Sequence, residues 1–177
     1  ITPFQICDDA PSEDEVSEAL MKLRNNKASG PSGIAVEDIK RWYTGARLTK
    51  DGEEPNQTDV DNWERVLNIV RKAFTHGEMP SAFDYSVLVL IPKSKPGEFR
   101  GIALLEVLYK LISSVLNRRI QHSITFLDEI HGFRPGRGTG TAIMEVKLLM
   151  QLHCRLNTPL YMIFIDLKKA YDTLDRA

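Results

Sequence analysis

The sequence predicts an α/β fold in the broad sense, an α+β arrangement that is mostly helical and holds one β-hairpin and one further strand. Three observations predict it. Apolar residues recur at helical spacing in several segments. Two β-prone runs flank the turn-like residues 92–98 (PKSKPGE). A third apolar run, residues 160–165 (LYMIFI), is long enough for a buried strand and too short for a globular helix.

Local signals place the helices. The first follows a capping-box pattern from Ser12 to Glu15 and is expected to end near residue 25. A short helix is expected over residues 36–43, and a long one ends before Gly77. Further helices are expected over about 104–125 and from a cap at Thr139 or Thr141 to about 156. The residues expected to face inward are Val16, Ala19, Leu20, Leu23, Val60, Trp63, Val66, Leu67, Val70, Phe74, Leu108, Leu111, Ile112, Val115, Leu116 and Ile120.

The remaining segments are expected to be strands and loops. Residues 85–91 (YSVLVLI) are a candidate for a buried strand, and residues 99–103 for the strand that returns from the hairpin. Residues 44–58 are polar and contain two glycines and a proline, which is typical of an exposed loop inserted within a domain.

Composition sets the broad class. The 177 residues are 42% apolar and 27% charged, which are globular values. No run of 18 apolar residues and no signal peptide occur, so we expect an intracellular protein without a membrane partner. Cys7 and Cys154 lie far apart without metal-ligand spacing and are expected to be reduced and mostly buried. The absence of an initiator methionine suggests a fragment.

The charge distribution is uneven although the net charge is only −1. Residues 1–85 carry 10 basic and 16 acidic side chains, whereas residues 86–137 carry 8 basic and 4 acidic ones. Such a basic segment can form a local phosphate-binding face, although a run of charges is also typical of an ordinary solvated surface.

The hairpin carries the first candidate site. Lys93 and Arg100 flank its tip, at positions that we expect to match on the two strands. Cations placed in this way can hold a triphosphate, arginine through its planar fork and lysine as a point charge. The alternative is a solvated hairpin tip without a ligand.

Two glycine-rich loops are further candidates. In the segment from Lys27 to Gly33, glycines at 30 and 33 could let backbone amides approach a phosphate, or could simply make a turn. In residues 131–138 (HGFRPGRG), Arg134 and Arg137 could contact backbone phosphates where glycine permits a close approach.

The last apolar run ends at a carboxylate. Asp166 follows residues 160–165 directly, where it could face a cleft and bind a hard cation such as Mg²⁺, or could cap the following turn. Tyr171 could form a wall of the same cleft. Two-metal phosphoryl chemistry needs more carboxylates than Asp166 alone provides.

Several separated motifs occur in a specific order. They are KASGPSGI at Lys27, PK…RGI from Pro92 to Ile102, GFRPGR at Gly132, and FIDLKKAYD around Asp166, with a helix before and after the GFRPGR loop. This order resembles the reverse transcriptases of non-LTR retrotransposons and group II introns, from about Ser12 to Ala177.

The resemblance implies an organisation and a set of roles. Residues 1–158 would be a fingers-like region, and residues 159–177 the first strand of a right-hand polymerase palm with the start of the next helix. Asp166 would be the first catalytic carboxylate and, with the Leu167 carbonyl, would bind two Mg²⁺ ions. The residues that would contact deoxynucleotide are Lys93, Arg100 and Tyr171, the last as a gate against the 2′-OH, and those near the template strand are Lys27, Gly30, Gly33, Arg134 and Arg137.

The resemblance also predicts what the chain lacks. The family places an aromatic-Ala-Asp-Asp hairpin downstream of the first aspartate, and no such motif occurs here. We therefore expect the N-terminal part of an RNA-directed DNA polymerase that acts on an RNA template, a DNA or RNA primer and dNTPs, and that needs the remainder of the polymerase chain. The alternative is a catalytically inactive RNA-binding remnant of a retroelement.

Overall fold

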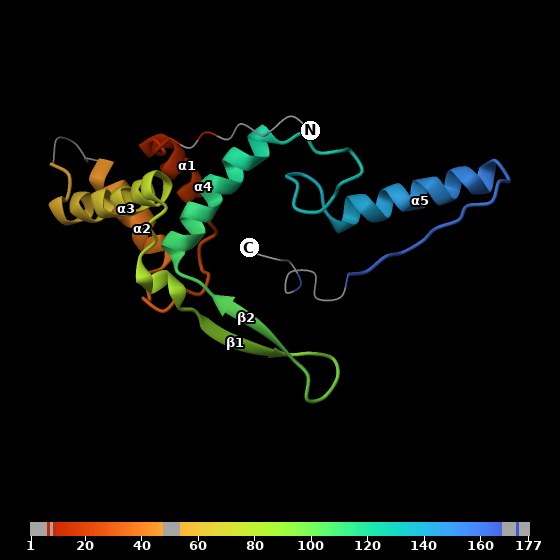
Figure 1. Ribbon diagram of the computed structural model, residues 1–177, viewed down its shortest axis with the longest axis horizontal. Helices are drawn as coiled ribbons and strands as arrows, with labels where there is room; N and C mark the ends of the chain where they lie inside the picture. The colour runs from red at the N-terminus through yellow and green to blue at the C-terminus, as the bar shows by residue number, and fades with distance from the viewer. Residues whose placement is uncertain (1–6, 8, 48–53, 168–172, 174–177) are drawn as a thin grey trace. The chain divides into compact units, whose positions relative to one another are not determined.

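The computed structural model describes residues 7, 9–47, 54–167 and 173, within two units that comprise residues 1–125 and 126–177. In the described part of the chain, five α-helices and one two-stranded antiparallel sheet confirm the predicted α+β class (Figure 1). The first unit contains α1 (Glu13–Lys22), α2 (Val36–Arg47), α3 (Gln57–His76), η1 (Ser81–Asp84), β1 (Val87–Pro92), β2 (Phe99–Leu104) and α4 (Val107–Ser123). The second contains α5 (Thr139–Arg155).

Side-chain caps set the helix ends close to where the sequence predicts them. The Ser12 hydroxyl accepts a hydrogen bond from the Glu15 amide at 3.2 Å, which is the first half of the predicted capping box. The Glu15 carboxylate also accepts two hydrogen bonds from Arg119 of α4. Asn56 caps α3, and Gly77 ends it with φ +66°, a conformation that favours glycine. Because α2 continues to residue 47 and α3 begins at 57, both ends of the segment predicted as a loop over 44–58 are helical.

The core of the first unit joins all four of its α-helices. Helical stripes on α1, α2, α3 and α4 pack together because each presents apolar side chains three and four residues apart. Leu116 was expected to join them but is 43% exposed, since it lies outside the stripe that faces α1 and α3. The buried apolar residues are Val16, Ala19, Leu20, Val36, Ile39, Trp63, Val66, Leu67, Val70, Val107, Leu111, Ile112 and Val115.

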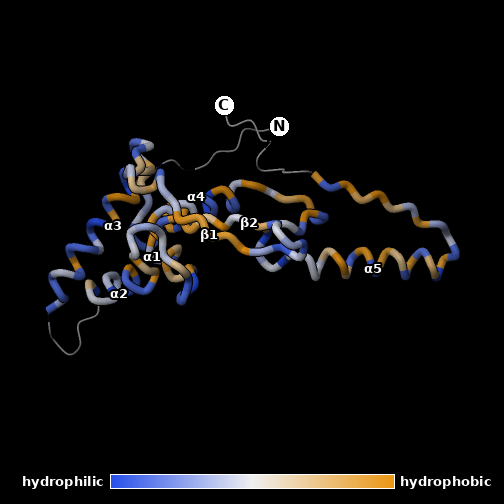
Figure 2. Tube along the Cα trace, turned by 90° about the horizontal axis from the view of Figure 1, so that it is seen from below, coloured by the Kyte–Doolittle hydropathy of each residue, from blue (hydrophilic) through white to orange (hydrophobic). Residues whose placement is uncertain are grey.

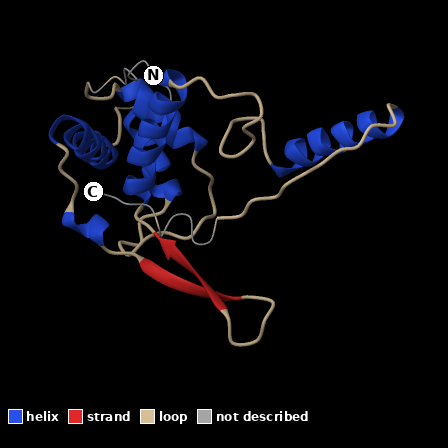
Figure 3. Ribbon diagram, turned by 45° about the vertical axis from the view of Figure 1, so that its right-hand side comes forward, coloured by secondary structure: helices blue, strands red, loops and turns tan. Residues whose placement is uncertain are grey.

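The hairpin extends away from these helices (Figure 1, Figure 3). β1 pairs with β2 from Val87 opposite Leu104 to Pro92 opposite Phe99. All six residues of β1 are exposed, so the prediction of a buried strand at 85–91 is wrong for the described structure. A strand is buried only when another layer covers it, and within the first unit no helix covers this sheet.

The second unit has a different character. Along α5, apolar residues alternate with polar ones, yet no residue of the helix is buried (Figure 2). Residues 158–167 adopt no regular structure, so the predicted strand over 160–165 does not form. The physical reason is that a strand requires a partner for its backbone hydrogen bonds, and the described residues provide none.

Two further expectations concern surface properties. Cys7 and Cys154 are unpaired thiols as predicted, but both are exposed instead of buried, because neither lies on a packed face. Among the described residues, no helix combines the length and the apolar character needed to cross a bilayer.

Candidate functional site

The hairpin tip is a well-defined turn. The Lys93 amide donates to the Glu98 carbonyl at 2.8 Å, which extends the β1–β2 pairing by one position. Beyond it, the Glu98 amide donates to the Lys95 carbonyl at 3.2 Å, with Pro96 and Gly97 between them. Gly97 has φ +81°. Proline followed by a left-handed glycine is the pattern of a type II turn, so this sequence fixes the register of the hairpin.

The register places the two predicted phosphate-binding cations on one face. Arg100 pairs with Ile91, and Lys93 lies one pair further out, opposite Glu98. Lys93 and Arg100 are therefore diagonal neighbours and not the matching pair that the sequence suggested. Because cross-strand pairs and every second residue share a face, both side chains still project from the same side of the hairpin.

A hollow of about 430 Å³ opens on the hairpin tip. Three cations border it, two of them the predicted pair and the third Lys95. The hollow is open to solvent, and its size suits a small polyanion. Its lining residues are Ile91, Pro92, Lys93, Ser94, Lys95, Glu98 and Arg100.

One carboxylate interrupts this basic face. Glu98 lies in the same hollow, with an oxygen 3.8 Å from the Lys93 ammonium. Both side chains are about half exposed, so the ion pair adds little to stability. Its consequence is local, because Glu98 offsets part of the positive charge that a phosphate would meet.

The glycine turn near Lys27 is bound to the fold in a way that the sequence did not indicate. The Gly33 amide donates to the Gly30 carbonyl at 3.1 Å and closes a turn. The Ser32 amide and hydroxyl both donate to the Glu106 carboxylate, at 2.7 and 2.6 Å. That amide is therefore already satisfied by an anion of the protein itself. Lys27 is exposed, whereas Gly30 is buried.

Both arginines of the second glycine-rich loop bind that loop. Arg134 donates to the carbonyls of Leu127 and Ile130, at 2.8 and 3.3 Å. Arg137 donates to the Asp128 carbonyl and, at 3.0 Å, to the Asp128 carboxylate. These bonds satisfy carbonyls that lack helical or strand partners. The two guanidinium groups thus shape residues 127–137 and are not cations without partners.

His131 ties the same loop to α5. Its Nδ1 lies 2.8 Å from the Thr141 hydroxyl, and its Nε2 lies 2.6 Å from a Glu145 oxygen. The helix begins at Thr139 with Gly138 as its N-cap, so neither predicted threonine is the cap residue; Thr141, in the first turn, bonds the Gly138 amide and carbonyl through its hydroxyl. These contacts give the loop a fixed orientation on α5 within the second unit.

The predicted metal ligands are exposed and isolated. Asp166 and Leu167 lie on the solvent-exposed segment after α5, and Tyr171 falls outside the described residues. Among the residues that the structure describes, no group of three or more His, Cys, Asp or Glu could hold a metal ion. One carboxylate and one carbonyl do not complete the six-ligand oxygen shell of Mg²⁺, so these residues alone do not form a metal site.

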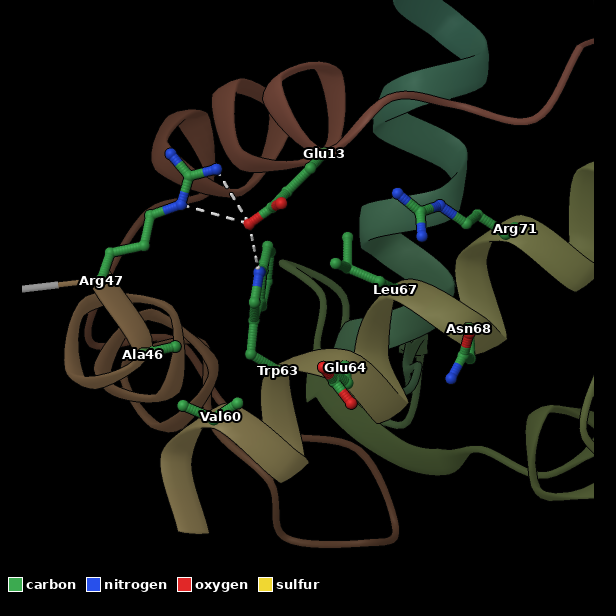
Figure 4. Close-up of a pocket in the computed structure, with 9 residues that line it drawn as sticks. All are labelled: Glu13, Ala46, Arg47, Val60, Trp63, Glu64, Leu67, Asn68 and Arg71. Atoms are coloured by element: carbon green, nitrogen blue, oxygen red, sulfur yellow. Dashed lines mark hydrogen bonds and ion pairs between the residues drawn. The ribbon is translucent and has the colours of Figure 1, made fainter. Parts of the chain in front are cut away.

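A second hollow, of about 440 Å³, opens between α1, α2 and α3 (Figure 4). At its wall, one Glu13 oxygen accepts hydrogen bonds from the Trp63 indole at 2.8 Å and from the Arg47 guanidinium. The Trp63 bond, followed by Arg47, holds the pKa of Glu13 below its ordinary value. None of the residues predicted for nucleotide, metal or template binding lines this hollow, and its polar groups join three helices.

Sequence reasoning missed Glu98, Glu106 and His131 as site residues. Glu98 could have been found, because the turn pattern alone places it opposite Lys93. Glu106 could not, since its partner Ser32 is 74 residues away. The partners of His131, Thr141 and Glu145, lie one to two helical turns into the following helix.

Comparison with known proteins now bears on these residues. Residues 91–177 match the family of "Reverse transcriptase (RNA-dependent DNA polymerase)". Over 92% of its length, the chain is 25% identical to the "Transposon TX1 uncharacterized 149 kDa protein" of Xenopus laevis. Over 94%, it is 26% identical to the "Retrovirus-related Pol polyprotein from type-2 retrotransposable element R2DM" of Drosophila melanogaster.

The chain spans only 12% and 16% of the length of these two relatives. The match covers β1 from Ile91, β2, α4, α5 and the segment with Asp166. These similarities confirm the resemblance inferred from the ordered motifs. Residues 91–177 are thus similar to the reverse transcriptase family, and most of the chain is similar to two retrotransposon proteins.

Proposed function

We propose that the chain is the fingers and the beginning of the palm of an RNA-directed DNA polymerase. The complete protein would extend a DNA or RNA primer with dNTPs along an RNA template. One observation carries the proposal: Lys93 and Arg100 share a face of the hairpin and border one hollow, within the segment that matches the reverse transcriptase family.

This face is suited to a triphosphate. Arg100 can offer two parallel N–H donors to one phosphate, and Lys93 can follow another as a point charge. The exposed position lets a nucleotide enter without rearrangement of the core. The hairpin therefore supplies charge and position, whereas the chemistry requires residues beyond these.

Binding to the isolated chain tests this role directly. Substituting Lys93→Ala or Arg100→Ala should weaken the binding of inorganic tripolyphosphate by about three- to tenfold each, the usual range for one hydrogen bond made in exchange with water. Lys72→Ala, which removes an exposed cation from α3, is the matched control. Equal affinities in all four proteins would contradict a phosphate site on the hairpin.

Reverse transcriptases generally use a divalent metal, and Asp166 is our candidate for the first carboxylate that holds it. We assign Mg²⁺, two ions in the complete enzyme, with the Leu167 carbonyl as a further ligand; the remaining ligands would come from outside the described residues. In the complete protein, Asp166→Asn should abolish primer extension and leave template binding intact. Retained extension would exclude this role.

The template and gate roles follow from the same proposal. We assign the template side to Lys27, Gly30 and Gly33 and to the loop of Arg134 and Arg137, in which the arginines act by holding the loop in shape. Tyr171 would lie under the sugar of the incoming nucleotide. Tyr171→Val in the complete protein should then raise ribonucleotide incorporation, and an unchanged ratio of ribonucleotide to deoxynucleotide would remove that role.

A further inference from the structure

Glu106 is a buried carboxylate to which the proposed polymerase mechanism gives no task. It follows β2 by two residues and directly precedes α4. The residue is only 6% exposed, and its two oxygens accept from the Ser32 amide and hydroxyl at 2.7 and 2.6 Å. Burying a carboxylate is costly unless it is hydrogen-bonded, so this contact is a strong constraint on both segments.

The backbone of the turn fits closely against the same junction. A Cβ atom placed on Gly30 would lie 2.7 Å from the Cα and N atoms of Glu106, closer than real contacts allow. Gly33 has φ +77°, which side chains rarely adopt. Of the two glycines that the resemblance assigns to the template side, Gly30 is thus required by its close approach to Glu106, and Gly33 by its own backbone conformation.

The hairpin depends on this junction for its direction. The strands β1 and β2 are exposed on both faces, apart from the partly exposed Leu104 at the end of β2. Since no helix of the first unit covers the sheet, its orientation is set where its two ends meet the helices. One of those ends is the residue pair 105–106, which directly follows Leu104, the last residue of β2.

We propose that the Ser32–Glu106 contact positions the hairpin, and that Glu106 is a positioning residue for the phosphate-binding face. The contact joins the glycine turn to the β2–α4 junction, so that Lys27 and Arg100 keep a fixed relation within the first unit. This inference rests on the proposed function for its consequence in binding, but its structural part can be tested without any ligand.

The first experiment measures hairpin orientation in the full chain. Nitroxide labels are attached at Ser94→Cys and Arg65→Cys, both exposed, after Cys7 and Cys154 are changed to serine. Pulsed electron resonance then gives the distribution of label distances. Glu106→Ala should broaden it markedly, and Ser32→Ala should do so less. Glu106→Gln should leave it near that of the unchanged protein, because its carbonyl accepts from the Ser32 amide and its NH₂ group donates to the hydroxyl.

Glu13→Ala is the matched control, since it also removes a hydrogen-bonded carboxylate from the first unit. It should lower the melting temperature without broadening the distribution. A distribution that stays narrow in both Glu106→Ala and Ser32→Ala would overturn the proposal. So would equal broadening by Glu13→Ala, because the effect would then be general loosening.

The second experiment measures tripolyphosphate binding by Glu106→Ala and Glu106→Gln in the chain without nitroxide labels. Glu106→Ala should weaken it about three- to tenfold, with recovery in Glu106→Gln. If Lys93→Ala weakens binding and Glu106→Ala does not, the phosphate site on the hairpin stands and the positioning role of Glu106 fails. If no variant, Lys93→Ala included, changes the affinity while Glu106→Ala still broadens the distances, the proposed nucleotide site fails and the positioning contact stands.

Discussion

At the scale of single residues, Glu98 places a negative charge on the face that Lys93 and Arg100 share. Its carboxylate is 3.8 Å from the Lys93 ammonium, and both groups line the hollow at the tip. A triphosphate in that hollow would meet this carboxylate as well as the cations. The net attraction is therefore smaller than the three basic residues alone would give.

Removing that charge should tighten phosphate binding. Glu98→Gln should lower the dissociation constant for tripolyphosphate by about two- to fivefold, the range of one exposed charge interaction. The measurement is calorimetric titration at low and moderate salt, and the gain should shrink as salt screens the face. Glu64→Gln, an exposed change of equal charge on α3, is the control. Weaker binding by Glu98→Gln would show that Glu98 orients Lys93 instead of opposing the ligand.

Glu15 gives the stability of the first unit a defined pH dependence. Arg119 donates to both oxygens of Glu15, at 2.7 and 2.8 Å, and this bond is the main cause that lowers the pKa of Glu15 below 4.5. Because the folded pKa is below the unfolded one, the stabilisation is complete above about pH 4.5 and is lost as the pH falls through the folded pKa.

Glu15→Gln should therefore lower the free energy of unfolding by about 1–2 kcal/mol near neutral pH and by progressively less below pH 4.5. Chemical denaturation between pH 3 and 7 measures this difference. Glu13, whose pKa is also lowered, leaves the variant with part of its acid sensitivity. A difference that is constant over this range would mean that charge on Glu15 does not contribute.

At the scale of elements, the hairpin depends on one glycine. Gly97 has φ +81° in the turn that closes with the Lys95–Glu98 bond. Gly97→Ala should cost about 1 kcal/mol locally and speed amide exchange in β1 and β2. Gly140→Ala is the control, because Gly140 lies in α5 without a positive φ and with nothing within 4 Å. Unchanged exchange in the hairpin would contradict the turn assignment.

The elements also show which features are local enough to predict. The ends of α1 and α3 could be predicted from Ser12 and Gly77, and the hairpin from Pro96 and Gly97, because caps and turns depend on adjacent residues. The burial of β1 could not, since an apolar run shows that a strand can be covered but not whether a covering layer is present.

The candidate site follows the same division. Lys93 and Arg100 could be predicted as neighbours because one turn separates them, although their diagonal register needed the ladder itself. The Ser32–Glu106 contact joins segments 74 residues apart, and the Glu15–Arg119 contact segments 104 apart. Single-sequence patterns carry no information on such pairs. Arg134 and Arg137 look like phosphate ligands in the sequence and instead bind nearby backbone and Asp128.

At the scale of the whole molecule, the two units differ in what stabilises them. The buried apolar cluster lies entirely between Val16 and Val115, in the first unit. In the described part of residues 126–177, no apolar residue is buried, and the order comes from polar contacts such as those of His131 and Arg137. Most of the stability of a protein helix comes from the packing of an apolar face, and none of the 17 residues of α5 is buried.

The second unit should therefore open before the first. Limited trypsin digestion of the chain should cut first after Arg137, Lys147 or Arg155, and should leave the sites on α3, such as Lys72, intact for much longer. Mass spectrometry over a time course identifies the fragments. Each of these second-unit sites lies outside any apolar core, so cleavage there requires only local opening.

Leu111→Glu provides the comparison, because a charge at this fully buried position should unfold the first unit and expose α3 to the protease. Cutting in α3 at the same rate as in α5 in the unchanged chain would contradict this difference, and would mean that the apolar cluster does not protect the first unit.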